Sequence, residues 1–486
     1  MIRILLLLLF IGAAANGNSQ QFTKTQVCYG INFGIAFDVA PDGRFFVTEK
    51  GLAGPAQVKV FDATGNFLSV FYDLTDSAYT GGERGVLGIT LDPDFSINHY
   101  VYVFYNYTDN PNNVSAGDDR IRIERFTDVA NTGTQPTIIF DLDIPDSLSS
   151  IHTGGNIHFR PSDSTHIYVT IGDMGTGYLG DTPARIDNPL GKILRVSKYP
   201  GGPPPSDNPF YDDGDPYVGN CDWIWAYGLR NSFDFCFGPN DSLYATENGT
   251  STFDEVNLIT RGGFYGWPFC EGSGDGDTLS IPCHAPNAIL PLVEVQGPVL
   301  PALTGVIFYT DTVWSVQQNH LVTGDFNHAD LTDIYLTNSP AYNSADSAVF
   351  WIDESNMNGI TDLWQGPDGC IYVLELSDTV FGGIYKICPV GTAITELSSS
   401  ITSLSAAPNP FNDQTVITYT LASSEPVHVV LYDALGREVA ILADGQQISG
   451  THQLVIDAEK MALSPGIYSC VLQSVYEMQS VSLIVE

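Results

Sequence analysis

The segment SSIHTGGNIHFRPSDSTHIYVTIGD, which starts at Ser149, has a histidine before a Thr-Gly-Gly turn and an aspartate after the next strand. A neutral imidazole is a good base near neutral pH when a carboxylate holds its other ring nitrogen. His152 is therefore a candidate base, and Asp173 is its candidate partner. The alternative is that His152 is an exposed loop residue. For His158 and His166, on a strand and in a turn, we expect packed or solvated roles.

A recurring sequence motif must form the elements that position these residues. An apolar strand, an aspartate- or proline-containing turn and an aromatic-rich strand recur in DVAPDGRFFVTE, TLDPDFSINHYVYVFY, HFRPSDSTHIYVTIGD, CFGPNDSLYATENG and WQGPDGCIYVLEL. The turn prolines are 52, 68, 78 and 128 residues apart, and the last interval is twice 64, so one copy has lost its signature. Six small antiparallel sheets predict a six-bladed β-propeller, in which ligands bind at one mouth of the central channel.

Composition and charge limit the classes of fold and of binding partner. The 486 residues include 47 Gly and 12% aromatic residues, a mixture that suits short strands joined by glycine turns. With 19 Lys plus Arg against 56 Asp plus Glu, the net charge is -37, so the protein repels phosphate backbones and anionic membranes. Nucleic-acid binding is therefore excluded. Most of the surplus carboxylates are expected on a solvated surface, and a minority are candidate calcium ligands.

The N-terminus MIRILLLLLFIGAAANGNSQ has one positive charge, an apolar run and small residues before a polar stretch. This pattern predicts a secretory signal peptide over residues 1–19. Later segments do not approach the roughly 20 apolar residues that a membrane helix needs. We therefore expect an exported, soluble mature protein with no transmembrane segment.

Export permits disulfides between the eight cysteines. Spacing favours Cys221 with Cys236 and Cys270 with Cys283, because each pair closes a short loop. A propeller commonly closes by pairing an N-terminal strand with its last sheet, here KTQVCYGI with GGIYKIC. Cys28 with Cys388 fits that closure and leaves Cys370 and Cys470 free. Other connectivities remain open.

The amino-acid composition of the chain changes after Cys388. The segment PVGTAITELSSSITSLSAAPNPFNDQ is rich in Ser, Thr, Ala and Pro, as linkers are. The segments that follow alternate apolar and polar residues and predict a small β-sandwich. We expect a propeller over residues 20–390, a linker over 391–402 and the sandwich over 403–486.

The last segment resembles the C-terminal sorting domain of type IX secretion substrates, through PNPFND, VVLYDALGREV and LSPGIYSCVL. This resemblance implies handling by the type IX secretion machinery. It also implies export through the periplasm and the outer membrane, so that the protein is secreted or stays on the cell surface. The alternative is an ordinary accessory β-sandwich.

Residues 25–390 resemble the soluble sugar dehydrogenases of the glucose/sorbosone dehydrogenase family, which depend on pyrroloquinoline quinone (PQQ). The matching phrases, in order, are GGERGVLGITLDPDF, IHTGGNIHFRP with TIGD, NPLGKILRV, IWAYGLRNSFDF, ATENGTSTFDEVNLITRGGFYGWP and GPDGCIYVLEL. The cysteines that flank WAYGLRN are also similar to the hedgehog-interacting-protein-like branch of the same fold. That branch is not built around sugar oxidation.

The resemblance implies a role for each matching residue. In the family, the histidine at the position of His152 takes the proton of the anomeric hydroxyl while hydride passes to PQQ. The matching cofactor-binding positions are Glu83, Arg230, Asn231 and Asn248, and the matching calcium positions are the carbonyls of Gly249 and Thr250, Glu255 and the carbonyl of Tyr265. Arginine suits this role because its planar group binds carboxylates through two parallel hydrogen bonds. The alternatives are that Arg230 lies at the surface or between sheets, and that GGFYGWP is only a tight turn.

Several positions depart from the family pattern. Glu83 replaces a glutamine, and Ile151 replaces the acidic or amide residue before the histidine. Gly359 and Thr361 stand where two arginines clamp the carboxylates of the quinone, and GDFNHADLTDI lacks an expected lysine. Each charge-assisted hydrogen bond that is lost weakens the free energy of quinone binding by about 1.5 to 3 kcal/mol.

The sequence thus predicts an exported quinoprotein-type dehydrogenase that oxidises an aldose or related sugar with PQQ and calcium. The alternative is a non-catalytic, secreted or surface-displayed propeller that binds a ligand and has lost the cofactor clamp. A calcium-dependent hydrolase has less support, since we find no matching acidic cluster in the sequence.

Overall fold

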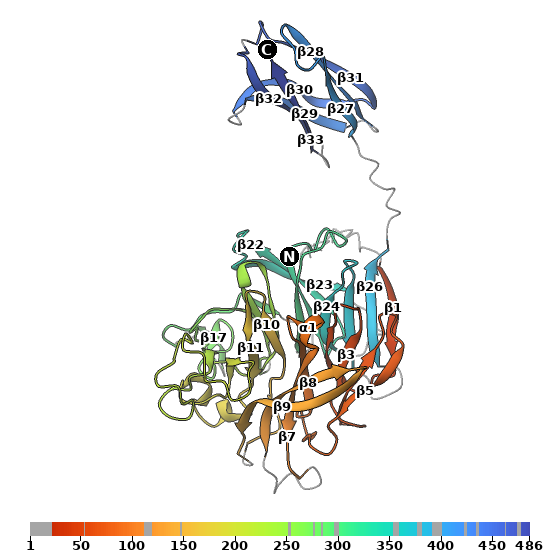
Figure 1. Ribbon diagram of the computed structural model, residues 1–486. Helices are drawn as coiled ribbons and strands as arrows, with labels where there is room; N and C mark the ends of the chain where they lie inside the picture. The colour runs from red at the N-terminus through yellow and green to blue at the C-terminus, as the bar shows by residue number, and fades with distance from the viewer. Residues whose placement is uncertain are drawn as a thin grey trace, which may run out of the picture. The chain divides into compact units, whose positions relative to one another are not determined.

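The protein is described by a computed structural model, which covers residues 22–486 with several gaps. The gaps are residues 53, 111–118, 146–147, 251–253, 276–277, 283–284, 296–300, 353–358, 377–381, 391–400, 422–424, 434–436, 462 and 474–477. The chain divides into two compact units, Met1–Pro389 and Val390–Glu486 (Figure 1). The regular elements of the described residues are strands, apart from one short α-helix, α1 (Phe95–Asn98), and three 3-10 helices of three residues each, so the predicted all-β class is confirmed. The signal peptide expected over 1–19 lies outside the described residues.

The described residues of the first unit form six four-stranded antiparallel sheets. The first sheet comprises β2 (Gly34–Val39), β3 (Phe45–Glu49), β4 (Gln57–Phe61) and β5 (Phe67–Asp73). The second comprises β6 (Val86–Leu91), β7 (Tyr100–Tyr107), β8 (Arg120–Val129) and β9 (Thr132–Asp143), and the third β10 (Ile157–Arg160), β11 (Asp163–Ile171), β12 (Lys192–Ser197) and β13 (Ile224–Tyr227). The fourth comprises β14 (Ser232–Phe237), β15 (Leu243–Glu247), β16 (Asp254–Ile259) and β19 (Val293–Val295), and the fifth β20 (Leu303–Tyr309), β21 (His320–Asp325), β22 (Leu331–Thr337) and β23 (Ser344–Ile352). The sixth comprises β24 (Ile360–Gln365), β25 (Ile371–Glu375), β26 (Gly383–Pro389) and β1 (Phe22–Tyr29); β17 (Gly274–Asp275) and β18 (Thr278–Pro282) form a separate hairpin.

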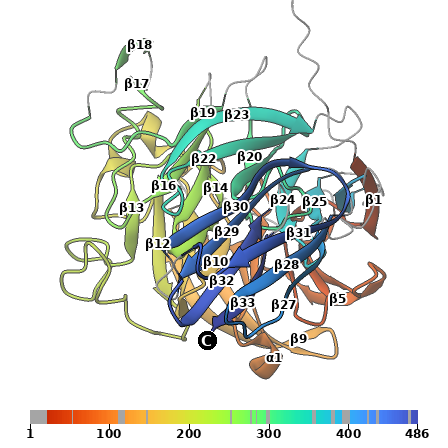
Figure 2. The ribbon, with the colours of Figure 1, turned by 90° about the horizontal axis from the view of Figure 1, so that it is seen from above.

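The first strands of the six sheets form a closed ring. β2 contacts β6, and the same contact links β6 to β10, β10 to β14, β14 to β20, β20 to β24 and β24 back to β2. Figure 2 shows the sheets following one another around this ring, from β5 through β9, β12, β16 and β23 to β1. Aspartates join neighbouring sheets, because buried backbone N–H groups need acceptors. Asp38 accepts from Leu91 N at 2.8 Å, Asp234 from Val306 N at 3.0 Å, and Asp362 from Phe37 N at 2.8 Å.

The ring closes through its first and last strands. β1 pairs antiparallel with β26 from Phe22 opposite Pro389 to Tyr29 opposite Gly383. The predicted pairing of KTQVCYGI with GGIYKIC is therefore confirmed.

The predicted disulfide at this closure is wrong. Cys388 is bonded to Cys370, at the start of the neighbouring strand β25, and Cys28 is a free, buried cysteine. Ile371 lies opposite Ile387, so Cys370 and Cys388 stand side by side at the same end of β25 and β26, whereas Cys28 lies opposite Ile384.

The predicted pair of Cys221 with Cys236 is also wrong. Both are free: Cys221 is buried in the connection before β13, and Cys236 lies on β14 in the next sheet. Cys270 is disulfide-bonded, while its predicted partner Cys283 lies outside the described residues. Cys470 is free, as expected.

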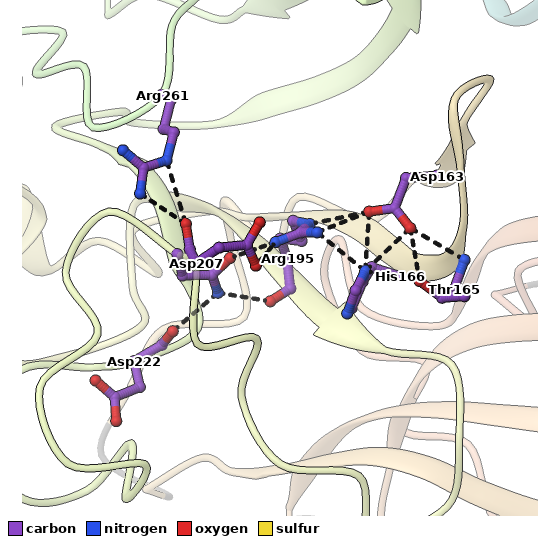
Figure 3. A network of polar contacts seen from close by, with 8 residues as sticks. Asp163, Thr165, His166, Arg195, Asp207, Asp222 and Arg261 are labelled. Carbon is purple, nitrogen blue, oxygen red and sulfur yellow. Dashed lines mark hydrogen bonds and ion pairs between the residues drawn. The ribbon is translucent and has the colours of Figure 1, made fainter.

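A polar network anchors the long connection between β12 and β13 (Figure 3). Arg195 on β12 donates to Asp163 at 2.8 Å and to Asp207 of this connection at 2.7 Å. Arg261 donates to the carbonyl of Asp207 at 2.6 Å. His166 lies 2.8 Å from Asp163, so it belongs to this network and is remote from the Thr-Gly-Gly turn.

Strand order brings the candidate site residues to one end of the ring. In an antiparallel sheet, the first strand starts and the second strand stops at the same end of the sheet. The connection that enters the first strand and the connection that leaves the second therefore lie close together. Glu83, His152 and Asn231 precede β6, β10 and β14. Asp173 and Asn248 follow β11 and β15. These five residues therefore lie at the same end.

The second unit contains two sheets. One is formed by β27 (Ile401–Ala407), β28 (Gln414–Leu421) and β31 (Gly450–Asp457), and the other by β30 (Glu438–Gln447), β29 (Glu425–Asp433), β32 (Gly466–Gln473) and β33 (Met478–Val485). Ile417, Tyr419 and Leu421 alternate along β28 and share one apolar cluster with Leu431 and Leu472 of the other sheet. The alternation seen in the sequence thus supplies the core of this unit. Its first strand begins at residue 401, inside the linker expected over 391–402.

We expect the Cys370–Cys388 bond to stabilise the first unit. The bond closes a loop over a sequence separation of 18 residues, so Cys370→Ala lowers the free energy of unfolding by about 3 kcal/mol. Denaturant unfolding measures this loss. Mass-spectrometric mapping of the intact protein is expected to yield a Cys370–Cys388 peptide, and a Cys28–Cys388 peptide would contradict the assignment.

Candidate active site

Connections of the third and fourth sheets meet at one end of the ring. Asp173 N donates to the carbonyl of Arg230 at 2.7 Å. The side-chain oxygen of Asn231 accepts from Gly154 N at 3.1 Å, and Asn248 N donates to the carbonyl of Asn231 at 3.2 Å. These bonds bring the IHTGG, TIGD, GLRN and ENGT segments into direct contact.

His152 and Asp173 form a buried hydrogen-bonded pair. Nδ1 of His152 lies 2.7 Å from Oδ1 of Asp173, and the two side chains are 7% and 0% exposed. Burial raises the pKa of Asp173, but hydrogen bonds from His152, Gly175 and the indole of Trp267 outweigh it and hold the pKa below its usual value. An ionised Asp173 only accepts hydrogen bonds, so a neutral His152 carries its proton on Nδ1. Its lone pair is then on Nε2, where a base needs it.

The backbone of His152 is in the left-handed region, with φ of 53°. Its carbonyl packs tightly on Gly172, where an added Cβ would lie 1.9 Å from the His152 oxygen. His152 N donates to Glu83 Oε2 at 2.5 Å. Non-glycine residues in this region are strained and persist when their surroundings hold them. Asp173, Gly172 and Glu83 together fix the imidazole in one position.

Arg230 lies beside this pair and is 9% exposed. Its Nη2 donates to the hydroxyl of Tyr178 at 2.7 Å, and its Nη1 donates to the carbonyl of Asn248 at 2.8 Å. Cζ of Arg230 lies 5.6 Å from the ring centre of Tyr178 and 5.7 Å from that of Trp267. The Tyr178 ring is in turn 5.9 Å from the His152 ring. Arg230 is therefore held next to the candidate base, whereas its contact with a cofactor stays a prediction.

Glu247 holds the GLRN connection in place. Oε1 accepts from Arg230 N at 2.9 Å and from Asn231 N at 2.5 Å, and Oε2 accepts from the Ser232 hydroxyl at 2.6 Å. Burial raises the pKa of Glu247 to about 7, although these hydrogen bonds oppose the effect. Glu247 was not predicted from the sequence, because the resemblance assigns roles to Asn248, Gly249 and Thr250 directly after it and none to Glu247 itself.

A second group of carboxylates lines a small cavity of about 10 Å³, the space of one water molecule or ion. Its walls include Glu247, Glu255 and Glu271, together with Gly249 and Tyr265. Burial and the negative charge of Glu247 and Glu271 raise the pKa of Glu255 to about 8, against the hydrogen bond from Asn257. Three carboxylates at one small cavity favour a cation there.

Three of the four predicted calcium positions line this small cavity, and Thr250 does not. Gly249 and Tyr265 line it, whereas the N–H of Thr250 donates to Glu271 at 2.6 Å. The buried side-chain oxygen of Asn257, beside Glu255, has no hydrogen-bond partner among the described residues. A buried carbonyl oxygen without a donor is a suitable calcium ligand. The donor set therefore fits calcium, and the sequence analysis missed Glu271.

The larger cavity at this end of the ring measures about 300 Å³, within the range of small-molecule sites. Its polar walls include Asn231, Asn248 and Glu83, and most of its remaining wall is apolar. The apolar lining residues are Phe33, Ile35, Leu52, Leu87, Phe233, Ala302, Phe326 and Leu376. A small, largely apolar ligand with a few polar groups fits such a cavity.

Gly359, the first position of the missing clamp, has no room for a side chain in this backbone. A Cβ at Gly359 would lie 2.5 Å from the carbonyl oxygen of Phe326. Thr361 lines the large cavity, and its hydroxyl lies 3.0 Å from the carbonyl of Gly34 and 3.2 Å from that of Leu374. The cavity therefore offers Asn231 and Asn248 to a quinone, whereas Gly359 and Thr361 supply no arginine pair.

The described residues thus form a ring of small sheets, with the buried His152–Asp173 pair, Arg230 and a carboxylate-lined cavity at one end. Residues 32–384 match the family model for glucose/sorbosone dehydrogenase. This match covers well over half of the chain, and the protein belongs to that family.

Individual relatives agree with the family. Quinoprotein glucose dehydrogenase B of Acinetobacter calcoaceticus is 29% identical over 319 residues, which are 62% of this chain and 64% of that protein. The alignment thus spans less than two thirds of that relative.

Two solved structures show the same fold. The apo form of the soluble aldose sugar dehydrogenase of Escherichia coli has a TM-score of 0.62 and 21% identity, over 76% of this chain and 100% of that chain. The PQQ-bound aldose sugar dehydrogenase of Streptomyces coelicolor has a TM-score of 0.57 and 21% identity, over 76% and 98%.

Residues 405–486 match the model for a secretion-system C-terminal sorting domain. The type IX resemblance is thereby confirmed, and such a domain indicates secretion. In the part of the chain that the structure describes, no helix has the length and apolar character needed to cross a membrane.

Calcium is expected to stabilise the first unit more at pH 8.5 than at pH 6. In the ion-free folded state the pKa of Glu255 is about 8, so the side chain keeps its proton up to that pH. In the unfolded chain the pKa of Glu255 is 4.5, and the proton is lost near that pH. Stability without calcium therefore falls as pH rises through this window, and calcium, which binds the ionised carboxylates, offsets the loss. Calorimetry with and without calcium measures the difference.

Glu271→Gln is expected to remove most of this calcium-dependent rise in Tm. Asp213→Asn is the matched control and should keep it, because Asp213 is an exposed carboxylate in a separate acidic group with the exposed Asp212 and the buried Asp222. An equal loss in both variants would place calcium elsewhere.

Proposed function

We propose that this protein is an exported quinoprotein-type dehydrogenase that oxidises an aldose or related sugar with PQQ and calcium. The observation that carries this proposal is the buried His152–Asp173 pair beside Arg230. The architecture that we propose is a six-bladed β-propeller followed by a small β-sandwich. Family membership and the names of the relatives support the reaction class.

His152 is the base in this proposal. With Nδ1 held by Asp173, Nε2 accepts the proton of the anomeric hydroxyl as the C1–H bond breaks. The imidazolium that forms is stabilised by the ionised Asp173, whose charge Gly175 and Trp267 support through hydrogen bonds. Bound PQQ supplies the acceptor for the hydride, and calcium supplies positive charge that favours its reduction.

Arg230, Asn231 and Asn248 bind and orient the cofactor in this proposal. Tyr178 and Trp267 fix the guanidinium of Arg230, and Glu247 fixes the backbone on either side of it. The carbonyls of Gly249 and Thr250 are the proposed ligands of a calcium ion at the quinone. Glu255, Glu271, Asn257 and the carbonyl of Tyr265 are the proposed ligands of a structural calcium ion.

A second candidate function rests on the apolar wall. Gly359 and Thr361 offer no charge to the carboxylates of PQQ, and Phe326 and Leu376 line the cavity near them. This wall favours a secreted propeller that binds an apolar ligand without redox chemistry.

Export follows from the sorting domain in this proposal. The signal peptide directs the chain to the periplasm, and the type IX machinery carries it across the outer membrane. The mature protein is then secreted or attached to the cell surface.

The deciding experiment adds PQQ and calcium to the purified protein and follows dye reduction with a panel of aldoses. Turnover that depends on both additions supports the dehydrogenase. If PQQ does not bind and no aldose is oxidised, the non-redox binding protein is the better description. His152→Ala should retain PQQ binding and lose turnover, and full activity of this variant would exclude His152 as the base.

Asp173→Asn is expected to lower kcat by about 10²- to 10⁴-fold with little change in KM. An amide in place of the carboxylate no longer stabilises an imidazolium and no longer fixes the proton on Nδ1. Steady-state kinetics over pH 5 to 9 measure the effect. An ordinary packing role for Asp173 would instead appear as a lower Tm with unchanged kcat in the folded fraction.

A further inference from the structure

The large cavity contains a buried lysine that the sequence analysis did not single out. Lys50 follows β3 in the first sheet and lines the cavity together with Asn231 and Asn248. Among the described residues that line this cavity, Lys50 is the one cationic side chain. Lys50 therefore stands in a different sheet from the two clamp positions, Gly359 and Thr361.

The position of Lys50 is fixed by its neighbours. Its backbone N–H donates to Phe33 O at 2.9 Å, and its carbonyl accepts from Val86 N at 3.3 Å. A Cβ at Gly85 would lie 2.5 Å from Cγ of Lys50, so the stem of the side chain packs closely on this glycine. The ammonium is thus placed at the cavity before any ligand arrives, which lowers the entropic cost of binding.

The ammonium of Lys50 retains donor capacity. The residue is 6% exposed, and Nζ donates to the carbonyl of Gly82 at 2.7 Å. An ammonium has three N–H donors, and this bond uses one of them. Burial lowers the pKa of Lys50, and the negative charge of Glu83 opposes the effect. A buried charge with few partners is costly unless an opposite charge comes close.

The surroundings favour an anion from the ligand as that partner. The carboxylate of Glu83 is engaged by the N–H of His152 at 2.5 Å. The walls near Lys50 include Leu52 and Phe33, whose low polarity strengthens any charge-assisted hydrogen bond formed there.

We propose that Lys50 Nζ binds a carboxylate of the molecule that fills this cavity. The inference rests on the proposed function. Two molecules could supply this carboxylate. One is PQQ, in which case Lys50 replaces the missing arginines as the cationic partner of the cofactor. The other is an acidic sugar such as a uronic acid.

The test uses the full-length protein with calcium and three variants. Lys50→Met removes the charge at similar volume, and Lys50→Arg keeps it. Lys59→Met is the matched control in the same sheet, since Lys59 pairs with Glu49 at 2.7 Å and does not line the cavity. Circular dichroism and Tm confirm that each variant is folded.

The first measurement is PQQ binding by equilibrium dialysis, without any sugar. If the cofactor is the source, Lys50→Met weakens PQQ binding about 10- to 100-fold, as expected for one lost charge-assisted contact. Lys50→Arg restores much of it, and Lys59→Met stays within about twofold of the wild type.

The second measurement titrates glucuronate and glucose into the same proteins by calorimetry. If the substrate is the source, Lys50→Met weakens glucuronate binding and leaves glucose and PQQ unchanged. Failure of the wild type to bind PQQ would overturn the proposed function, and the glucuronate titration then decides the role of Lys50. The inference is overturned if Lys50→Met matches Lys59→Met for both PQQ and glucuronate, including the case in which the wild type binds neither.

Discussion

Closure of the ring is the constraint on which the rest of the first unit depends. The inner strands of six sheets contact one another in a circle, and the antiparallel pairing of β1 with β26 completes the last sheet. An open arrangement would leave the inner faces of the first and sixth sheets in water and their strand edges unpaired. Because the circle closes, Lys50 of the first sheet and Thr361 of the sixth line the same cavity as Asn231 of the fourth.

Buried carboxylates perform two different tasks in this circle. Asp38, Asp234 and Asp362 accept N–H groups of the neighbouring sheets and so hold the sheets together. Glu255 and Glu271 instead meet at a small cavity, where their charges repel and a cation is the natural partner. The large negative charge of the chain therefore includes a few carboxylates with specific partners, in addition to a solvated surface.

The sequence predicted the features that local patterns encode. Alternation and turn residues predicted the all-β class and the pairing of the end strands, and the resemblance directed attention to His152, Asp173 and Arg230. Two of the predicted disulfides were wrong because neither spacing nor a shared sheet gives the register between strands. Ile371 lies opposite Ile387, which places Cys370 beside Cys388, whereas Cys28 of the same sheet lies opposite Ile384.

The unpredicted site residues depend on contacts between distant segments. Glu271 and Lys50 belong to no motif, and they reach the site only because separate sheets converge there. Glu247 was missed for a related reason: its task is to hold backbone N–H groups of another strand, which leaves no pattern in its own neighbourhood.

The pairing of β1 with β26 has a kinetic consequence for a chain made from its N-terminus. Thr23 lies opposite Cys388, so the first strand to emerge waits for more than 360 further residues before its partner exists. Contacts of such sequence separation form slowly and leave strand edges exposed in the meantime. The circle is therefore completed only after β26 has been made, so the first unit cannot finish folding before its last strand has emerged.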